Sequence, residues 1–225
     1  MIEYIILVFF FIFAFVEIFA EFKDNDKIIY ISKPLVMPLL ILFYIFGVIE
    51  SGSITQVDWL IVIALMGGWG GDIFLMLKDE DKWFLPGMGS FLINQIFYTI
   101  SFFLSITDFA ALNLWGLFLI LPALLILIFT VPRFVKNTGD MKIPVLVYMG
   151  AILLMHIAAL LRIAQFQGLP FILVYVGSLS YIFSDAMLAS NKWTGEFTNA
   201  RSIVMSTYFM AQFYITLGVL FSSLL

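Results

Sequence analysis

The stretch GGWGGDIFLML, residues 67–77, places one carboxylate and four glycines inside an otherwise apolar run. An ionised side chain at membrane depth costs about 2.5–3.5 kcal/mol on insertion scales, so it normally faces a partner or a wet cavity. A second stretch, GSLSYIFSDAMLA, residues 177–189, repeats this character in the other half of the chain. We therefore predict that Asp72 and Asp185 meet across one cavity around which the chain is arranged.

The composition around these stretches indicates a membrane protein. Of 225 residues, 63% are hydrophobic and 12% charged, whereas a soluble domain is about half apolar and a quarter charged. The absence of cysteine excludes disulfides and thiolate sites, and a single histidine argues against a zinc site. The net charge of −4 comes without a basic cluster that would suggest nucleic acid. We expect no metal, no cofactor and no nucleic-acid partner.

Spanning a bilayer takes about 20 apolar residues, and eight segments meet this requirement. They are residues 2–20, 34–50, 58–77, 84–104, 113–131, 144–163, 170–189 and 202–224. We interpret the first as a retained span and not as a signal peptide. The sequence thus predicts a single all-α domain, 1–225, of eight antiparallel transmembrane helices joined by short connections.

Prolines are expected to mark helix starts and kinks. Four of them suit the first turn of a helix, where the missing N–H costs little: Pro34, Pro86, Pro144 and Pro170. Two others, Pro38 and Pro122, lie deeper in their segments and are expected to kink them.

Basic residues alternate between connections and predict the orientation. The odd connections hold Lys23, Lys27, Lys33, Lys78, Lys82, Arg133, Lys136, Lys142, Lys192 and Arg201, whereas the even ones hold only Arg162. The positive-inside rule then places the odd connections in the cytoplasm and both termini outside. Asp72 precedes Lys78 by six residues and Asp185 precedes Lys192 by seven. Both aspartates should therefore lie about 10 Å inside the cytoplasmic boundary.

A weak internal repeat relates the halves 1–110 and 111–225. The matching pairs are Lys33-Pro34 with Lys142 and Pro144, Asp72 with Asp185, and Lys82-Trp83 with Lys192-Trp193. An offset near 110 residues spans four helices, so the halves would be parallel repeats with a site at their junction.

Two carboxyls in an apolar wall suit acid–base chemistry. Burial and a like-charged neighbour separate their titrations, so that one can hold a proton while the other acts as a base. The alternative is structural: each aspartate caps a helix or pairs with a buried lysine. We favour function because the two depths match. For the glycines we favour close helix packing over room for a substrate tail.

Further polar residues fall in the same zone and form the candidate substrate-binding set. They are Lys33, Asn94, Gln95, Tyr98, Tyr148, Ser184, Tyr208 and Gln212. Hydrogen bonding between helices is the alternative for any one of them. Lys33 either anchors a phosphate or extends to the membrane surface. We interpret His156 as an interhelical residue and Glu17 as an interfacial charge.

These residues give the chain a resemblance to the lysoplasmalogenase family of YhhN-like membrane proteins. The resemblance covers nearly the whole length and rests on Lys33-Pro34-Leu35, on residues 71–75 and 184–189, on the Tyr98 and Tyr148 regions, and on residues 208–212. In one departure, Gln95 stands where many members have histidine. If that histidine transfers a proton, Gln95 can only orient water or substrate.

The resemblance implies an integral-membrane hydrolase that cleaves the vinyl-ether bond of lysoplasmalogens to a fatty aldehyde and a glycerophospho-base. Its substrate is a lysophospholipid taken from the bilayer, and no cofactor is needed. Asp72 and Asp185 become the catalytic pair, in a bacterial cytoplasmic membrane with the site on the cytoplasmic side. Two other functions stay open: a proton-coupled transporter, and a membrane protein that binds lysolipid without catalysis.

Overall fold

The computed structural model describes residues 1–52, 54–112 and 114–224, and every regular element in them is a helix. Eight of these helices belong to segments that are long and apolar enough to cross a membrane. This confirms the predicted fold class, an all-α membrane protein with eight transmembrane helices. They are α1 (Ile2–Phe22), α2 (Asp26–Ser51), α3 (Trp59–Met76), α4 (Glu80–Leu104), α5 (Leu121–Phe134), α6 (Lys142–Leu161), α7 (Leu169–Thr194) and α8 (Ala200–Ser222).

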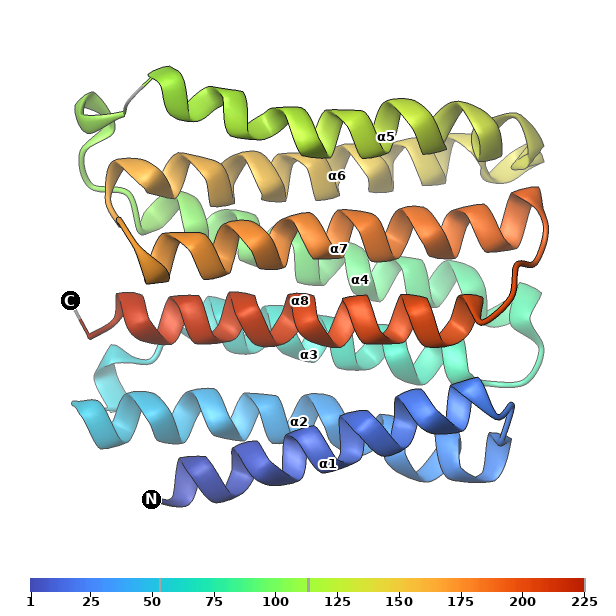
Figure 1. The fold of residues 1–225 in the computed structure, drawn as a ribbon, viewed down its shortest axis with the longest axis horizontal. Helices are drawn as coiled ribbons and strands as arrows, with labels where there is room; N and C mark the ends of the chain where they lie inside the picture. Colours follow the sequence, from blue (N-terminus) through green and yellow to red (C-terminus); the bar gives the residue numbers. More distant parts are fainter. Residues whose placement is uncertain (53, 113, 225) are drawn as a thin grey trace.

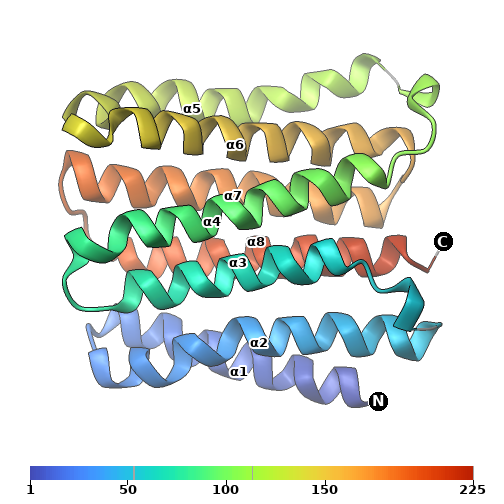
Figure 2. The ribbon, with the colours of Figure 1, turned by 180° about the vertical axis from the view of Figure 1, so that it is seen from behind.

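The helices run antiparallel to their neighbours in sequence, and both termini lie at one end of the bundle (Figure 1). α3 and α4 lie behind α7 and α8 in this view, and in front of them when the molecule is seen from behind (Figure 2). α1 and α2 lie at one edge, and α5 and α6 at the other. Three sequential hairpins, α1–α2, α3–α4 and α7–α8, pack most closely.

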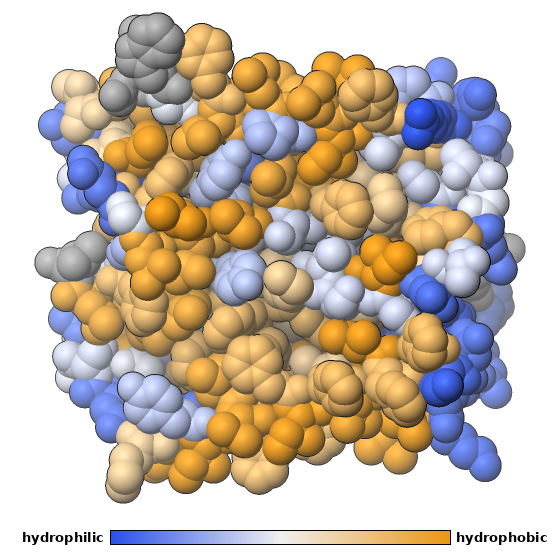
Figure 3. All heavy atoms as spheres, viewed as in Figure 1, coloured by the Kyte–Doolittle hydropathy of each residue, from blue (hydrophilic) through white to orange (hydrophobic). Residues whose placement is uncertain are grey.

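Hydrophobic residues form a broad band across the middle of the molecule, and hydrophilic residues gather at its two ends (Figure 3). Such a band suits lipid contact, because apolar side chains facing hydrocarbon avoid the cost of meeting water.

Two basic residues assigned from sequence to the connections are nevertheless buried. Lys33 is only 6% exposed and Arg162 only 1%. Lys33 lies inside α2, so the prediction that it belongs to the first connection is wrong, whereas Arg162 lies directly after α6, in the 3₁₀-helix Arg162–Ala164.

Several helix starts differ from the predicted ones. α2 begins at Asp26, because Asn25 caps it by accepting a hydrogen bond from the backbone N–H of Ile28. Pro34 therefore lies inside the helix and not in its first turn, and Pro86 lies inside α4 in the same way. Pro122 shows the opposite error, since it occupies the first turn of α5.

The fifth predicted segment is also irregular. A 3₁₀-helix, Leu114–Ile120, precedes α5, and a second one, Val135–Asn137, follows it. α5 alone has 14 residues, which at 1.5 Å per residue is too short for a bilayer core about 30 Å thick. The 3₁₀ turns extend it to a span of 22 residues, Gly116–Asn137.

A tryptophan of α3 compensates for one of the two prolines within α2, Pro38. Because Pro38 has no N–H, the carbonyl of Pro34 lacks its usual donor one turn later. The indole Nε1–H of Trp69 in α3 donates to that carbonyl at 2.9 Å. The bond joins α2 to α3 at the level where Lys33 and Asp72 project.

Glycines set the separation of two hairpins. A Cβ atom on Gly67 would lie 2.8 Å from the backbone nitrogen of Asn94 in α4. A Cβ on Gly177 would lie 2.9 Å from the backbone oxygen of Ala211 in α8. Contacts this short with backbone atoms leave no room for a side chain, so these glycines allow the helices to approach closely.

Candidate functional site

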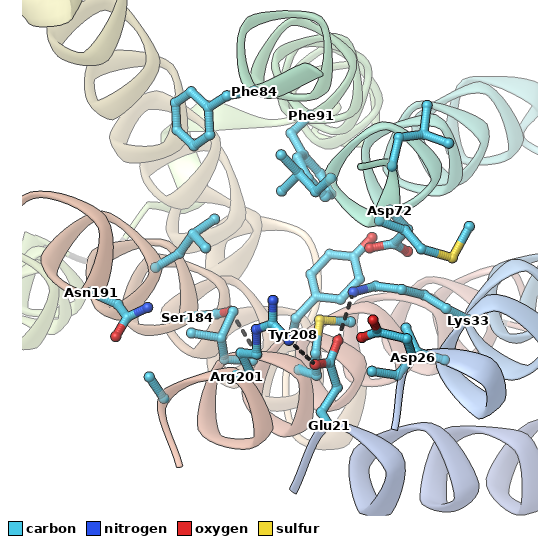
Figure 4. A pocket seen from close by; sticks show the side chains of 18 of the residues that line it. Glu21, Asp26, Lys33, Asp72, Phe84, Phe91, Ser184, Asn191, Arg201 and Tyr208 are labelled. Carbon is cyan, nitrogen blue, oxygen red and sulfur yellow. Dashed lines mark hydrogen bonds and ion pairs between the residues drawn. The ribbon is translucent and has the colours of Figure 1, made fainter. Parts of the chain in front are cut away.

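A cavity of about 310 Å³ enters the bundle from the end opposite the termini. Its mouth includes residues of the α3–α4 connection and the start of α8, and its walls come from α1, α2, α3, α4, α7 and α8. Five of the predicted site residues line it: Lys33, Asp72, Ser184, Asp185 and Tyr208. Figure 4 shows several of these side chains directed into the cavity from different helices.

Asp72 lies in the last turns of α3, where its side chain is 2% exposed. Within the described part of the chain, its Oδ2 atom is buried and has no hydrogen-bond partner. The side chains of Lys33 and Tyr208 point toward it (Figure 4). A buried polar atom without a protein partner at a cavity wall is available to a ligand or a water molecule.

Asp185 reaches the same cavity from α7, and two predicted residues contact it. The Tyr148 hydroxyl in α6 donates to Asp185 Oδ2 at 2.7 Å, and the Gln95 amide in α4 donates to the same oxygen at 3.4 Å. Donors from two other helices thus orient this carboxylate, so that Asp185 has a fixed geometry at the wall.

Lys33 is held by two acidic residues of α1. Its Nζ lies 3.1 Å from an oxygen of Glu21 and 3.7 Å from one of Glu17. The expectation that Lys33 extends to the membrane surface is therefore wrong. A phosphate would have to compete with Glu21 for its ammonium group.

Glu17 and Glu21 are the acidic residues whose role the sequence reasoning missed. Glu17 is fully buried, so its interpretation as an interfacial charge is wrong. Glu21 lines the cavity and lies 3.9 Å from Arg201 at the mouth. Two signals in the sequence could have found them. The two residues are four apart along α1 and so share one helix face, and Glu17 lies within an apolar run.

Three predicted residues lie deeper in the bundle and do not line this cavity. Asn94 donates to the carbonyl of Ala64 at 2.6 Å, and Tyr98 donates to Gln212 at 2.6 Å. These bonds join α4 to α3 and to α8, as the structural alternative expected. All three side chains are buried.

Gly68 allows part of this deeper polar group to approach the site. A Cβ on Gly68 would lie 2.7 Å from the Tyr208 hydroxyl and 3.2 Å from the amide nitrogens of Asn94 and Gln212. Polar atoms from α4 and α8 thus converge on the bare backbone of α3, one turn before Asp72.

Two other polar residues are engaged elsewhere. The Ser184 hydroxyl lines the cavity but donates to the backbone oxygen of Val204 at 2.9 Å, which ties α7 to α8. His156 is buried against Ser178, 2.9 Å from its hydroxyl, in keeping with an interhelical role. In the part of the chain that the structure describes, no three His, Asp or Glu side chains are grouped so as to hold a metal ion.

The site therefore combines two buried aspartates, a paired lysine and tyrosine hydroxyls in a cavity open to the hydrophilic end of the bundle. A carboxyl group that can donate a proton and a carboxylate that can accept one are the requirements of acid–base catalysis on a bound lipid.

Comparison with known proteins gives a match to a protein family. A family model described as the YhhN family matches residues 28–219, a range that includes both aspartates and every other predicted site residue. No curated protein and no solved structure matches the chain.

Proposed function

Because the chain belongs to the YhhN family, the family of lysoplasmalogenase-like proteins, we propose that it hydrolyses the vinyl-ether bond of lysoplasmalogens. The observation that carries the proposal is that Asp72 and Asp185, 113 residues apart in sequence, line one cavity within a membrane bundle. The products are a fatty aldehyde and a glycerophospho-base.

The reaction needs one proton donor, one water molecule and one base. A protonated carboxyl transfers a proton to the double-bond carbon next to the aliphatic chain, which leaves an oxocarbenium ion at the carbon bonded to oxygen. Water adds to that carbon and gives up a proton to the second carboxylate. The resulting hemiacetal collapses to the aldehyde and the free hydroxyl of the glycerol. Glycosidases divide a related transition state between two carboxyls in the same way.

The contacts of the two aspartates suggest their roles. Asp185 accepts hydrogen bonds from Tyr148 and Gln95, and such donors favour an ionised carboxylate. Among the described residues, Asp72 has an Oδ2 atom with no donor. We therefore assign the proton to Asp72 as general acid, and the stabilisation of the cation and activation of water to Asp185.

Replacing either aspartate by asparagine tests the proposal. We expect Asp72→Asn and Asp185→Asn to lower aldehyde release from lysoplasmenylethanolamine in detergent by about a hundredfold or more, because each removes an acid or a base. The control is Asp140→Asn, an exposed aspartate outside the cavity. It should keep wild-type turnover.

The outcomes separate the three candidate functions. Unchanged turnover in both variants, or no turnover by the wild type, contradicts the proposal. Substrate flux into liposomes without product supports a transporter. Binding of lysolipid with neither flux nor product supports a non-catalytic lipid-binding protein.

A further inference from the structure

A second, smaller cavity of about 30 Å³ lies beside the cavity that holds the aspartates. We call it the apolar branch. Its walls come from α3, α4, α6 and α7, and its polar lining residues are Tyr148 and Asp185. Leu75, Phe84, Phe91, Asp185 and Leu188 line both cavities, so the two spaces adjoin one another.

Helical spacing places the boundary between these spaces next to the candidate catalytic pair. Leu75 follows Asp72 by three residues in α3, and Leu188 follows Asp185 by three in α7. Residues three apart lie on one face of a helix. Each helix therefore presents an aspartate to the larger, polar cavity and a leucine to its junction with the apolar branch.

We propose that the apolar branch receives the aliphatic chain of the lysolipid while the headgroup occupies the larger cavity. This inference rests on the proposed function and adds to it the orientation of the substrate. In a lysoplasmalogen the bond to be cleaved lies where the chain meets the glycerol. With the chain in the branch, that bond sits at the boundary beside Asp185, the aspartate that lines both spaces.

The lining of the branch suits a chain that continues toward the bilayer. Met88 of α4 and Trp193 of α7 line the branch and not the larger cavity, and both are partly exposed. The Phe84 ring meets Trp193 edge-on, with centroids 5.4 Å apart. The space is narrow, and the flexible thioether of Met88 is the kind of side chain that moves to admit an alkyl group. The chain would pass between α4 and α7 to lipid.

A substitution that narrows the branch tests this orientation. Met88→Trp adds bulk at a partly exposed position, where the fold can tolerate it. We expect kcat/KM for a sixteen-carbon vinyl-ether lysolipid to fall about tenfold, because the chain loses apolar contact. A four-carbon analogue should keep its wild-type rate. The matched control is Met210→Trp in α8, at a residue 48% exposed and outside both cavities.

A cross-linking experiment gives a readout that does not depend on turnover. The probes are two saturated alkyl-ether lysolipids, which lack the reactive double bond, with a diazirine near the chain end or on the headgroup. We expect the chain probe to label α4 and α7 near Met88 and Trp193. The headgroup probe should label the residues around Glu21 and Tyr30 at the mouth of the larger cavity. Met88→Trp should abolish only the labelling by the chain probe.

The two experiments distinguish failure of this inference from failure of the proposed function. Aldehyde formation with chain-probe labelling on α1 or α2, or with no change in chain-length preference in Met88→Trp, overturns the orientation and leaves the hydrolase. Labelling at Met88 and Trp193 without aldehyde formation from any substrate overturns the hydrolase and keeps the binding orientation.

Discussion

The Tyr148 hydroxyl donates a hydrogen bond of 2.7 Å to Asp185 Oδ2. Among the described residues, this is the shortest hydrogen bond from a side chain to either candidate catalytic aspartate. Tyr148 lines the apolar branch and not the larger cavity, and we propose that its hydroxyl acts on the reacting bond through Asp185. It is a positioning residue. A carboxylate held at one angle can face the reacting carbon in every encounter, whereas a rotating one cannot.

Removing this hydroxyl should affect the reaction step more than binding. We expect Tyr148→Phe to lower kcat about tenfold to a hundredfold with little change in KM, since a hydrogen bond to a charged group contributes about 1.5–3 kcal/mol. Steady-state aldehyde release over a range of lysolipid concentrations measures both constants. The control is Tyr175→Phe, whose lost hydroxyl donates to the Leu119 carbonyl at 2.8 Å, outside both cavities. Equal losses in the two variants would rule out the positioning role.

Residue chemistry could be predicted from the sequence only in part. An aspartate in an apolar segment is conspicuous because its burial is costly, and this cost identified Asp72 and Asp185. The partners of a charge are set by which helices touch, which a single sequence does not give. The two roles considered for Lys33 therefore did not include its buried partner Glu17, which was assigned to an interface.

At the scale of helices, the close approach of α7 to α8 depends on Gly177. We expect Gly177→Ala to lower the thermal unfolding temperature in detergent, because a Cβ would meet the backbone of Ala211 and Ile215 at 2.9 Å, where neither atom can move aside. Gly150→Ala is the matched control. Apart from its chain neighbours and the nearby backbone of its own helix, no described atom lies within 4 Å of the Cβ position there, so the substitution should leave the temperature unchanged or raise it. A higher temperature in both variants would show that helix propensity, and not packing, dominates.

Helix existence was predictable and helix boundaries were less so. Eight apolar runs give eight spans because length and hydropathy suffice to identify a membrane helix. The start of α2 was placed eight residues late because Pro34 resembles a first-turn proline, whereas Asn25 provides the cap. A tertiary contact, the indole of Trp69, supplies the donor that is missing at Pro38, and contacts of this kind cannot be predicted from local pattern.

For the whole molecule, the distribution of basic residues predicts the orientation. With Lys33 and Arg162 buried, nine of the eleven lysines and arginines remain, all near the end of the bundle that carries the cavity mouth. By the positive-inside rule we expect that end, and with it the candidate site, to face the cytoplasm.

The natural absence of cysteine allows a direct measurement of orientation. We expect Glu196→Cys, in the α7–α8 connection, to resist a membrane-impermeant maleimide in intact cells and to react in inverted vesicles. Ser51→Cys, at the end of α2 on the side of the termini, should show the reverse. Both positions are exposed. Labelling of Glu196→Cys from outside would invert the topology.

The bond from Trp69 to Pro34 has a mechanical consequence for lipid entry. It clamps α2 to α3 one turn before Asp72, so the flank of the cavity built by these two helices behaves as a rigid wall. A lipid wider than the resting space must then displace the opposite flank, where Met88 of α4 and Leu188 and Trp193 of α7 line the apolar branch. Lipid entry would then move α4 and α7 apart while α2 and α3 keep their positions.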